Sequence, residues 1–128
     1  MNDEIDYKLG IIWQDIQHRR IVEITKELNT NQNVDYKSIF DQLTFYIEDH
    51  FNTEEQYMRK FAYDKIESHI EGHKTFKNKF DELAKSFFID DNFILTLSSF
   101  LNYWLPEHIL VVDKELAAFL LKCERKNT

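Results

Sequence analysis

The side chains of this sequence that are best suited to chemistry are its histidines. In the stretch ESHIEGHKTF, His69 and His73 are four residues apart, a spacing that places both imidazoles on one face of a helix. Each of the five histidines in the chain falls on the apolar stripe of an expected helix: His18, His50, His69, His73 and His108. One inward-facing histidine is most often an ordinary core residue, but five would leave many buried donors and acceptors to satisfy. The pattern therefore predicts a shared metal site.

Two carboxylates share these stripes. Glu54 follows His50 by four residues, so both side chains reach one centre, although this spacing alone is a weak signal. Asp113 follows His108 by five residues, which on an ideal helix turns it about 140° away. A carboxylate among apolar neighbours is costly without a partner. Because Pro106 removes a backbone donor just upstream, we predict a kink or a π-type widening between Pro106 and Asp113.

The number of candidate ligands indicates two metal ions. Five imidazoles and two carboxylates exceed the three or four protein ligands of a single zinc site. If both ions are six-coordinate, two bridging carboxylates and a solvent-derived oxo or hydroxo bridge leave one position open, at the ion with fewer histidines. The ligand types suit iron but do not separate it from manganese or zinc. Oxygen-activating di-iron bundles use Glu-x-x-His motifs, which this sequence lacks, so the nitrogen-rich set favours reversible binding over oxidation chemistry.

The elements that must carry these residues are helices. Two glycines and one proline are too few for the turns of an all-β fold. Amphipathic segments cover about residues 15–29, 35–62, 64–86 and 91–122, after an N-terminal arm of about residues 1–13. Asp15 is the expected N-cap of the first helix, and Asp90 or Asp91 that of the last. We predict an all-α fold, an antiparallel up-down-up-down four-helix bundle with an N-terminal arm, as a single domain over residues 1–128.

Four motifs, one on each expected helix, resemble those of the hemerythrin family and in particular of its bacterial members. They are DIQH at residues 15–18, HFNTEEQYM at 50–58, HIEGH at 69–73 and WLPEHILVVD at 104–113. The resemblance implies a centre of two iron ions with an oxo or hydroxo bridge, which binds dioxygen reversibly at the iron with two histidines. It assigns His69, His73 and His108 to one iron, His18 and His50 to the other, and Glu54 and Asp113 to both as bridges.

The resemblance also implies an apolar oxygen pocket next to the irons. Its residues are Ile21, Phe51, Trp104, Leu105 and Ile109. For Ile21 and Phe51, ordinary core packing is an equal alternative. Glu55 and Glu71 adjoin the ligand motifs but are expected on the solvated surface, and Cys123 is expected to have no role.

These features favour an oxygen-binding protein for delivery, storage or sensing, and not an enzyme. The alternatives are a di-iron redox enzyme (an oxidase, peroxidase or nitric oxide reductase) and an iron-handling protein, and nitric oxide is a second candidate gas. A net charge of −7 without a large basic cluster argues against a nucleic-acid partner. No apolar run is long enough for a membrane span, and the acidic N-terminus lacks the apolar segment of a secretory signal. A single cysteine fits a reducing cytoplasm.

Overall fold

All regular structure is helical in the part of the chain that its computed structural model describes, residues 6–30, 35–85 and 93–126. The first three helices are α1 (Ile12–Thr30), α2 (Tyr36–Lys60) and α3 (Ile66–Ala84). The last helical column is continuous and consists of α4 (Phe93–Glu107), the π-helix η1 (His108–Asp113) and α5 (Lys114–Lys126). Within the described ranges, none of the helices has the length and apolar character that crossing a membrane requires.

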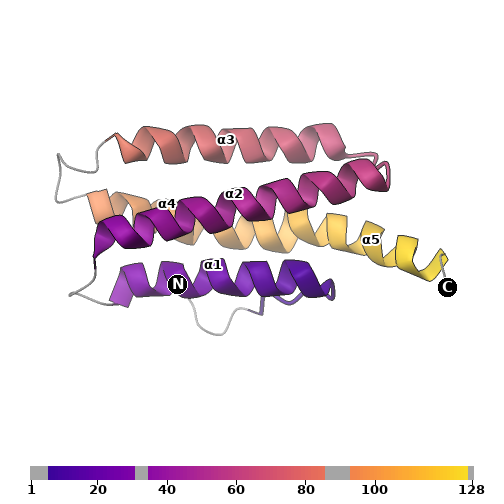
Figure 1. Cartoon of the computed structure of the whole chain (residues 1–128), viewed down its shortest axis with the longest axis horizontal. Coiled ribbons are helices and arrows are strands. Elements are labelled where there is room, and N and C mark those ends of the chain that lie inside the picture. The colour runs from indigo at the N-terminus through magenta and orange to yellow at the C-terminus, as the bar shows by residue number, and fades with distance from the viewer. Residues whose placement is uncertain (1–5, 31–34, 86–92, 127–128) are drawn as a thin grey trace.

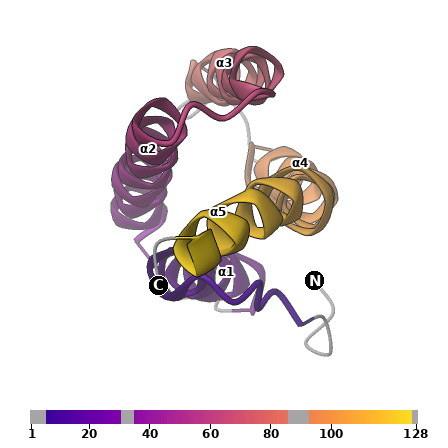
Figure 2. The same ribbon diagram turned by 90° about the vertical axis from the view of Figure 1, so that its right-hand side faces the viewer.

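The helices form an antiparallel bundle. α1 packs against α2 and α4, α2 packs against α3, and α3 packs against α4. The colour gradient in Figure 1 shows that successive columns run in opposite directions, and Figure 2 shows them around a common interior. The predicted all-α, up-down-up-down four-helix bundle is therefore confirmed.

The apolar interior consists of two clusters. The larger apolar cluster is formed by Ile21, Ile24, Leu28, Ile39, Leu43, Ile47, Phe51, Phe76, Phe80, Leu83, Phe93, Leu97, Leu101, Leu105 and Ile109. The smaller apolar cluster is formed by Ile11, Met58, Tyr63, Leu116, Ala117 and Leu120. The buried His18 of α1 lies between Ile11, just before the helix, and Ile21, and the buried Glu54 of α2 lies between Phe51 and Met58. A buried polar layer therefore separates the two clusters.

The start of α1 differs from the predicted one. The helix begins at Ile12, so the arm is shorter than expected and Asp15 is not its N-cap. The Asp15 carboxylate instead accepts hydrogen bonds from the backbone N–H groups of Leu9 and Gly10, at 2.7 and 3.1 Å. Gly10 has φ +99°, a conformation that glycine adopts without strain. Asp15, in the first turn of α1, thus holds the arm against the start of the helix through these hydrogen bonds.

Two further helix ends bear on the predictions. α2 ends at Lys60, earlier than expected, because Ala62 has a left-handed φ of 54° and turns the chain toward α3. The predicted end of the third helix at residue 86 lies outside the described residues. The same is true of the predicted start of the last helix at residue 91 and of its N-cap, Asp90 or Asp91.

Replacing Asp15 by alanine is expected to lower the free energy of unfolding by about 1 kcal/mol, the usual net contribution of an intramolecular hydrogen bond. The variant loses the acceptor for two backbone N–H groups. Chemical unfolding of the metal-free protein measures the change. The exposed Glu27 on the same helix supplies the control, since Glu27→Ala is expected to change the free energy by less than about 0.5 kcal/mol. Equal losses in both variants would contradict the role of Asp15 in holding the arm.

Candidate metal centre

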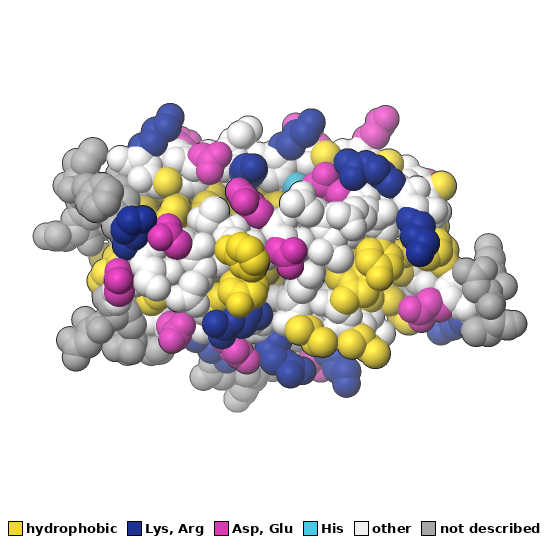
Figure 3. Space-filling model, viewed as in Figure 1, with side chains coloured by type: hydrophobic (Ala, Val, Ile, Leu, Met, Phe, Trp, Pro, Cys, Tyr) yellow, Lys and Arg dark blue, Asp and Glu magenta, His cyan; other side chains and the backbone are white. Residues whose placement is uncertain are grey.

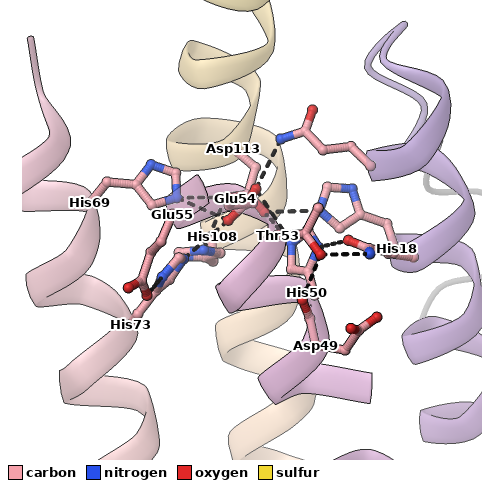
Figure 4. Close-up of polar contacts among 12 residues, drawn as sticks. His18, Asp49, His50, Thr53, Glu54, Glu55, His69, His73, His108 and Asp113 are labelled. Carbon is pink, nitrogen blue, oxygen red and sulfur yellow. Dashed lines mark hydrogen bonds and ion pairs between the residues drawn. The ribbon is translucent and has the colours of Figure 1, made fainter. Parts of the chain in front are cut away.

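The buried polar layer of the bundle contains all seven residues that the sequence suggested as metal ligands. We call these residues the ligand layer: His18 from α1, His50 and Glu54 from α2, His69 and His73 from α3, and His108 and Asp113 from η1. Each is at most 5% exposed. Their side chains converge from all four helical columns (Figure 4). The outer surface, in contrast, carries interspersed acidic and basic side chains and shows almost no histidine on the face seen in Figure 3.

Three histidines face one oxygen of each carboxylate. His69 Nε2 and His73 Nε2 lie 3.0 and 3.1 Å from Glu54 Oε1. His108 Nε2 lies 3.0 Å from Asp113 Oδ1, and His69 Nε2 lies 3.2 Å from the same oxygen. We call His69, His73 and His108 the three-histidine group.

The other two histidines face the second oxygen of each carboxylate. His18 Nε2 lies 2.9 Å from Asp113 Oδ2. His50 Nε2 lies 3.4 Å from Asp113 Oδ2 and also 3.4 Å from Glu54 Oε2. We call His18 and His50 the two-histidine group. Glu54 and Asp113 thus each present one oxygen to either group, which is the arrangement of carboxylates that bridge two metal ions.

The donor set fits cations better than it fits hydrogen bonds alone. His108 Nε2 and Asp113 Oδ1 are buried without a hydrogen bond among the described residues, although they lie only 3.0 Å apart. The Nε2 atoms of His18 and His50 lie 3.1 Å apart, and both also approach the same carboxylate oxygen. Ligand atoms of the layer fall into two sets, each within 4.8 Å, and Glu54 and Asp113 belong to both sets. Imidazole and carboxylate are suitable ligands for transition metals, so the layer could hold two such ions.

The π-helix η1 carries Asp113 into the ligand layer. At its end the N–H of Lys114 reaches back to the carbonyl of Ile109, five residues earlier. In this wider turn, residues five apart come close to the same helix face, so Asp113 joins His108. Pro106 lies just before, in the last turn of α4. The widening that was predicted between Pro106 and Asp113 is confirmed.

Two side chains behind the ligand layer hold two of its imidazoles in place. His50 Nδ1 donates to Gln17 Oε1 at 2.7 Å, and His73 Nδ1 donates to Glu55 Oε2 at 3.0 Å. In the neutral form of the ring, which is the form that binds metal, each hydrogen bond selects the tautomer whose Nε2 lone pair points into the layer. The prediction that Glu55 belongs to the solvated surface is therefore wrong, because α3 brings a histidine against it. Glu71 is exposed, as predicted.

Sequence reasoning missed a third polar neighbour of the layer, Gln14. This residue is completely buried, and its Nε2 donates to Glu54 Oε2 at 2.9 Å. Its spacing was a usable signal, since it lies one turn before His18 on the same stripe of α1. Gln17 and Glu55 gave no such signal. Each lies beside the apolar stripe of its own helix and contacts a residue of the ligand layer that comes from a different helix.

The charges of the ligand layer compensate one another. Burial and the nearby Asp113 raise the pKa of Glu54, but attraction to His50 and hydrogen bonds from two other histidines lower it to about 2. Burial also raises the pKa of Asp113, but attraction to the ring of His108, 3.0 Å away, brings it well below its ordinary value. Burial lowers the pKa of His69, whereas its close approach to the carboxylates of Asp113 and Glu54 raises it to about 9. Both carboxylates are therefore anionic at neutral pH, the form that binds metal.

The five residues that were predicted to line an oxygen pocket lie in or against the larger apolar cluster, next to the ligand layer: Ile21, Phe51, Trp104, Leu105 and Ile109. Phe51 stacks on the ring of His73 with centroids 3.8 Å apart, and Trp104 stacks on His108 at 4.2 Å. Leu105 and Ile109 are almost completely buried. These side chains cover the layer with apolar surface, and their part in oxygen binding stays a prediction.

The fold and the ligand layer define a four-helix-bundle protein with a buried histidine–carboxylate site for cations. The family model described as "Hemerythrin HHE cation binding domain" matches residues 10–120, and the chain belongs to this hemerythrin family. The chain is 33% identical over 120 residues to a bacteriohemerythrin of Clostridium acetobutylicum, covering 86% of this chain and 93% of the relative. This chain is also 28% identical to a bacteriohemerythrin of Stenotrophomonas maltophilia and 26% identical to one of Aquifex aeolicus. These matches cover 88% and 86% of this chain, and 76% and 89% of the two relatives. The family resemblance of the four sequence motifs is thereby confirmed.

Proposed function

We propose that this protein binds dioxygen reversibly at a pair of iron ions held by the ligand layer. The observation that carries the proposal is the division of each carboxylate between the two histidine groups. A cation-binding family and relatives named bacteriohemerythrin support iron and dioxygen as the metal and the ligand.

In this proposal the two irons differ in their protein ligands. His69, His73 and His108 would hold one iron, His18 and His50 would hold the other, and Glu54 and Asp113 would be shared by the pair, together with the oxo or hydroxo group that the family resemblance implies. The two-histidine group offers one ligand fewer, so the exogenous molecule is expected on that side. When bound, the iron pair supplies the open coordination position and the electrons that reversible binding of dioxygen requires.

The residues of the chain support this chemistry in two ways: they hold the imidazole rings in place, and they exclude water from the site. Gln17 and Glu55 fix the rings of His50 and His73, so that the ligands do not reorient when a small molecule enters. The larger apolar cluster excludes water, which would otherwise promote irreversible oxidation of the centre. Both contributions favour binding and release over turnover.

The physiological role that we propose is oxygen delivery, storage or sensing by a single domain over residues 1–128, in a reducing cytoplasm. The one cysteine, Cys123, is free, which suits that compartment. Nitric oxide is a second gas that the same position would accept. A di-iron redox enzyme and an iron-handling protein are the competing functions, and the following experiment separates them.

The test begins with metal analysis of the iron-loaded protein, which should bind a pair of irons per chain. The protein is then reduced without air, and oxygen is admitted and removed while the visible spectrum is followed. Absorption bands that appear and vanish over repeated cycles support reversible binding. A single irreversible oxidation would favour the redox enzyme, and a content far below two irons would overturn the site itself.

Replacing Leu105 by alanine is expected to accelerate autoxidation several-fold, because the shortened side chain admits water beside the ligand layer. The cavity should also lower the free energy of unfolding by roughly 2–5 kcal/mol, so the rate is compared at a temperature where both proteins are folded. Leu95 lies on the same helix and is 68% exposed, and Leu95→Ala serves as the control. An autoxidation rate like that of the wild type in Leu105→Ala would contradict the assignment of the pocket.

A further inference from the structure

Gln14 is a buried polar residue that the proposed ligand set does not use. It lies on α1 one turn after Ile11 and one turn before His18, and none of its surface is exposed. Its Nε2 donates to Glu54 Oε2 at 2.9 Å, while its Oε1 has no hydrogen-bond partner among the described residues. The contact with Glu54 is therefore the interaction that holds this amide.

The orientation of the Gln14 amide follows from the chemistry of its partner. An ionised carboxylate only accepts hydrogen bonds, so the NH₂ end of the amide must face Glu54 and the carbonyl end must face away. An apolar side chain would fill this place on the stripe without burying an unpaired carbonyl. The amide is therefore explained by what it does to Glu54.

The hydrogen bond selects one of the two oxygens of Glu54. Oε1 faces His69 and His73 of the three-histidine group, whereas Oε2 faces His50 of the two-histidine group at 3.4 Å. Gln14 donates to Oε2, which is the oxygen directed at the ion expected to receive the exogenous ligand.

We propose that Gln14 is a positioning residue that holds Glu54 Oε2 and stabilises the reduced state of the metal beside His18 and His50. An N–H donor withdraws charge from a carboxylate ligand, so the carboxylate donates less strongly to the metal and the lower oxidation state becomes more favourable. This inference rests on the proposed di-iron function and adds a residue that controls the redox balance of that site.

Gln17 acts on the same metal in the opposite sense. It accepts a hydrogen bond from His50 Nδ1, which makes the imidazole a stronger donor to the metal. Removal of Gln17 should therefore favour the reduced state, while removal of Gln14 should disfavour it. Since both glutamines lie on α1 within one turn, a general disturbance of the helix would not produce shifts of opposite sign.

The experiment measures the midpoint potential of the iron-loaded wild type, Gln14→Met and Gln17→Met by spectroscopic redox titration. Gln56, which is exposed on α2, provides the neutral control as Gln56→Met. For Gln14→Met we expect the equilibrium for reduction to weaken about threefold, a shift of roughly 30 mV to more negative potential for a one-electron step. Gln17→Met should shift to more positive potential, and Gln56→Met should not shift.

Gln14→Asn is a second variant that keeps an amide but shortens it, and it should shift in the same direction as Gln14→Met. Unfolding of the metal-free variants shows whether packing alone has changed. An unshifted potential in both Gln14 variants, or a shift of the same sign as in Gln17→Met, would overturn the role of Gln14. Failure of the wild type to hold a redox-active iron pair would instead overturn the proposed function, and the inference with it.

Discussion

Replacing Asp113 by asparagine is expected to abolish binding of the metal pair, leaving one ion per chain or none. The two oxygens of Asp113 face four imidazoles: Oδ1 lies near His69 and His108, and Oδ2 lies near His18 and His50. A neutral amide offers one weak oxygen donor in place of two charged ones, so the variant cannot bridge two cations. The charge that offsets two adjacent metal ions is also reduced.

The measurement is metal content per chain after loading and desalting, together with the visible spectrum. Glu115→Gln is the matched control, because Glu115 lies on the same helical column but is solvent-exposed and pairs with Lys65. This variant should load iron like the wild type. Retention of both ions in Asp113→Asn, with unchanged affinity, would show that this carboxylate does not bridge the site.

Replacing His73 by alanine is expected to lower the affinity of the three-histidine group for its ion more than about 100-fold. Loss of a residue that only supports a metal ligand already lowers metal affinity roughly 10–100-fold. The variant removes one of three imidazoles and also the ring on which Phe51 stacks. The second ion, beside His18 and His50, keeps all its direct ligands, so the variant should bind it more strongly than the ion of the three-histidine group.

Titration against a chelator of known affinity resolves the two binding steps of His73→Ala. The neighbouring Lys74 is exposed, and Lys74→Ala provides a control on the same turn of α3. Two binding steps indistinguishable from those of the wild type would refute the assignment of His73. An equal loss in both steps would contradict the division of the layer into two groups.

The convergence of the ligand layer could be predicted from the sequence because each helix places its histidines and carboxylates by its own periodicity. His50 and Glu54, or His69 and His73, share a face at a spacing of four whatever lies opposite. The π-turn was predictable for the same local reason, because a spacing of five between His108 and Asp113 fits one turn only if that turn is widened.

The residues behind the ligands were not predictable in this way, because their contacts cross between helices. Gln17 on α1 meets His50 on α2, and Glu55 on α2 meets His73 on α3. Which flank of a helix faces its neighbour depends on how the helices rotate when they pack, and the spacing within one helix does not contain that rotation. Asp15 was misassigned because an acidic residue near a helix start stabilises it from inside the first turn as well as from the N-cap.

The ligand layer lies between the two apolar clusters and contains side chains from every helical column. Binding of the proposed iron pair would therefore stabilise the folded chain, and the folded fraction would depend on the supply of iron. Ions that bind only the folded chain stabilise it in proportion to the logarithm of their free concentration. In cells short of iron, more of the chain would populate unfolded forms that proteases degrade. The abundance of the protein would then follow the iron available to it, without any dedicated regulator.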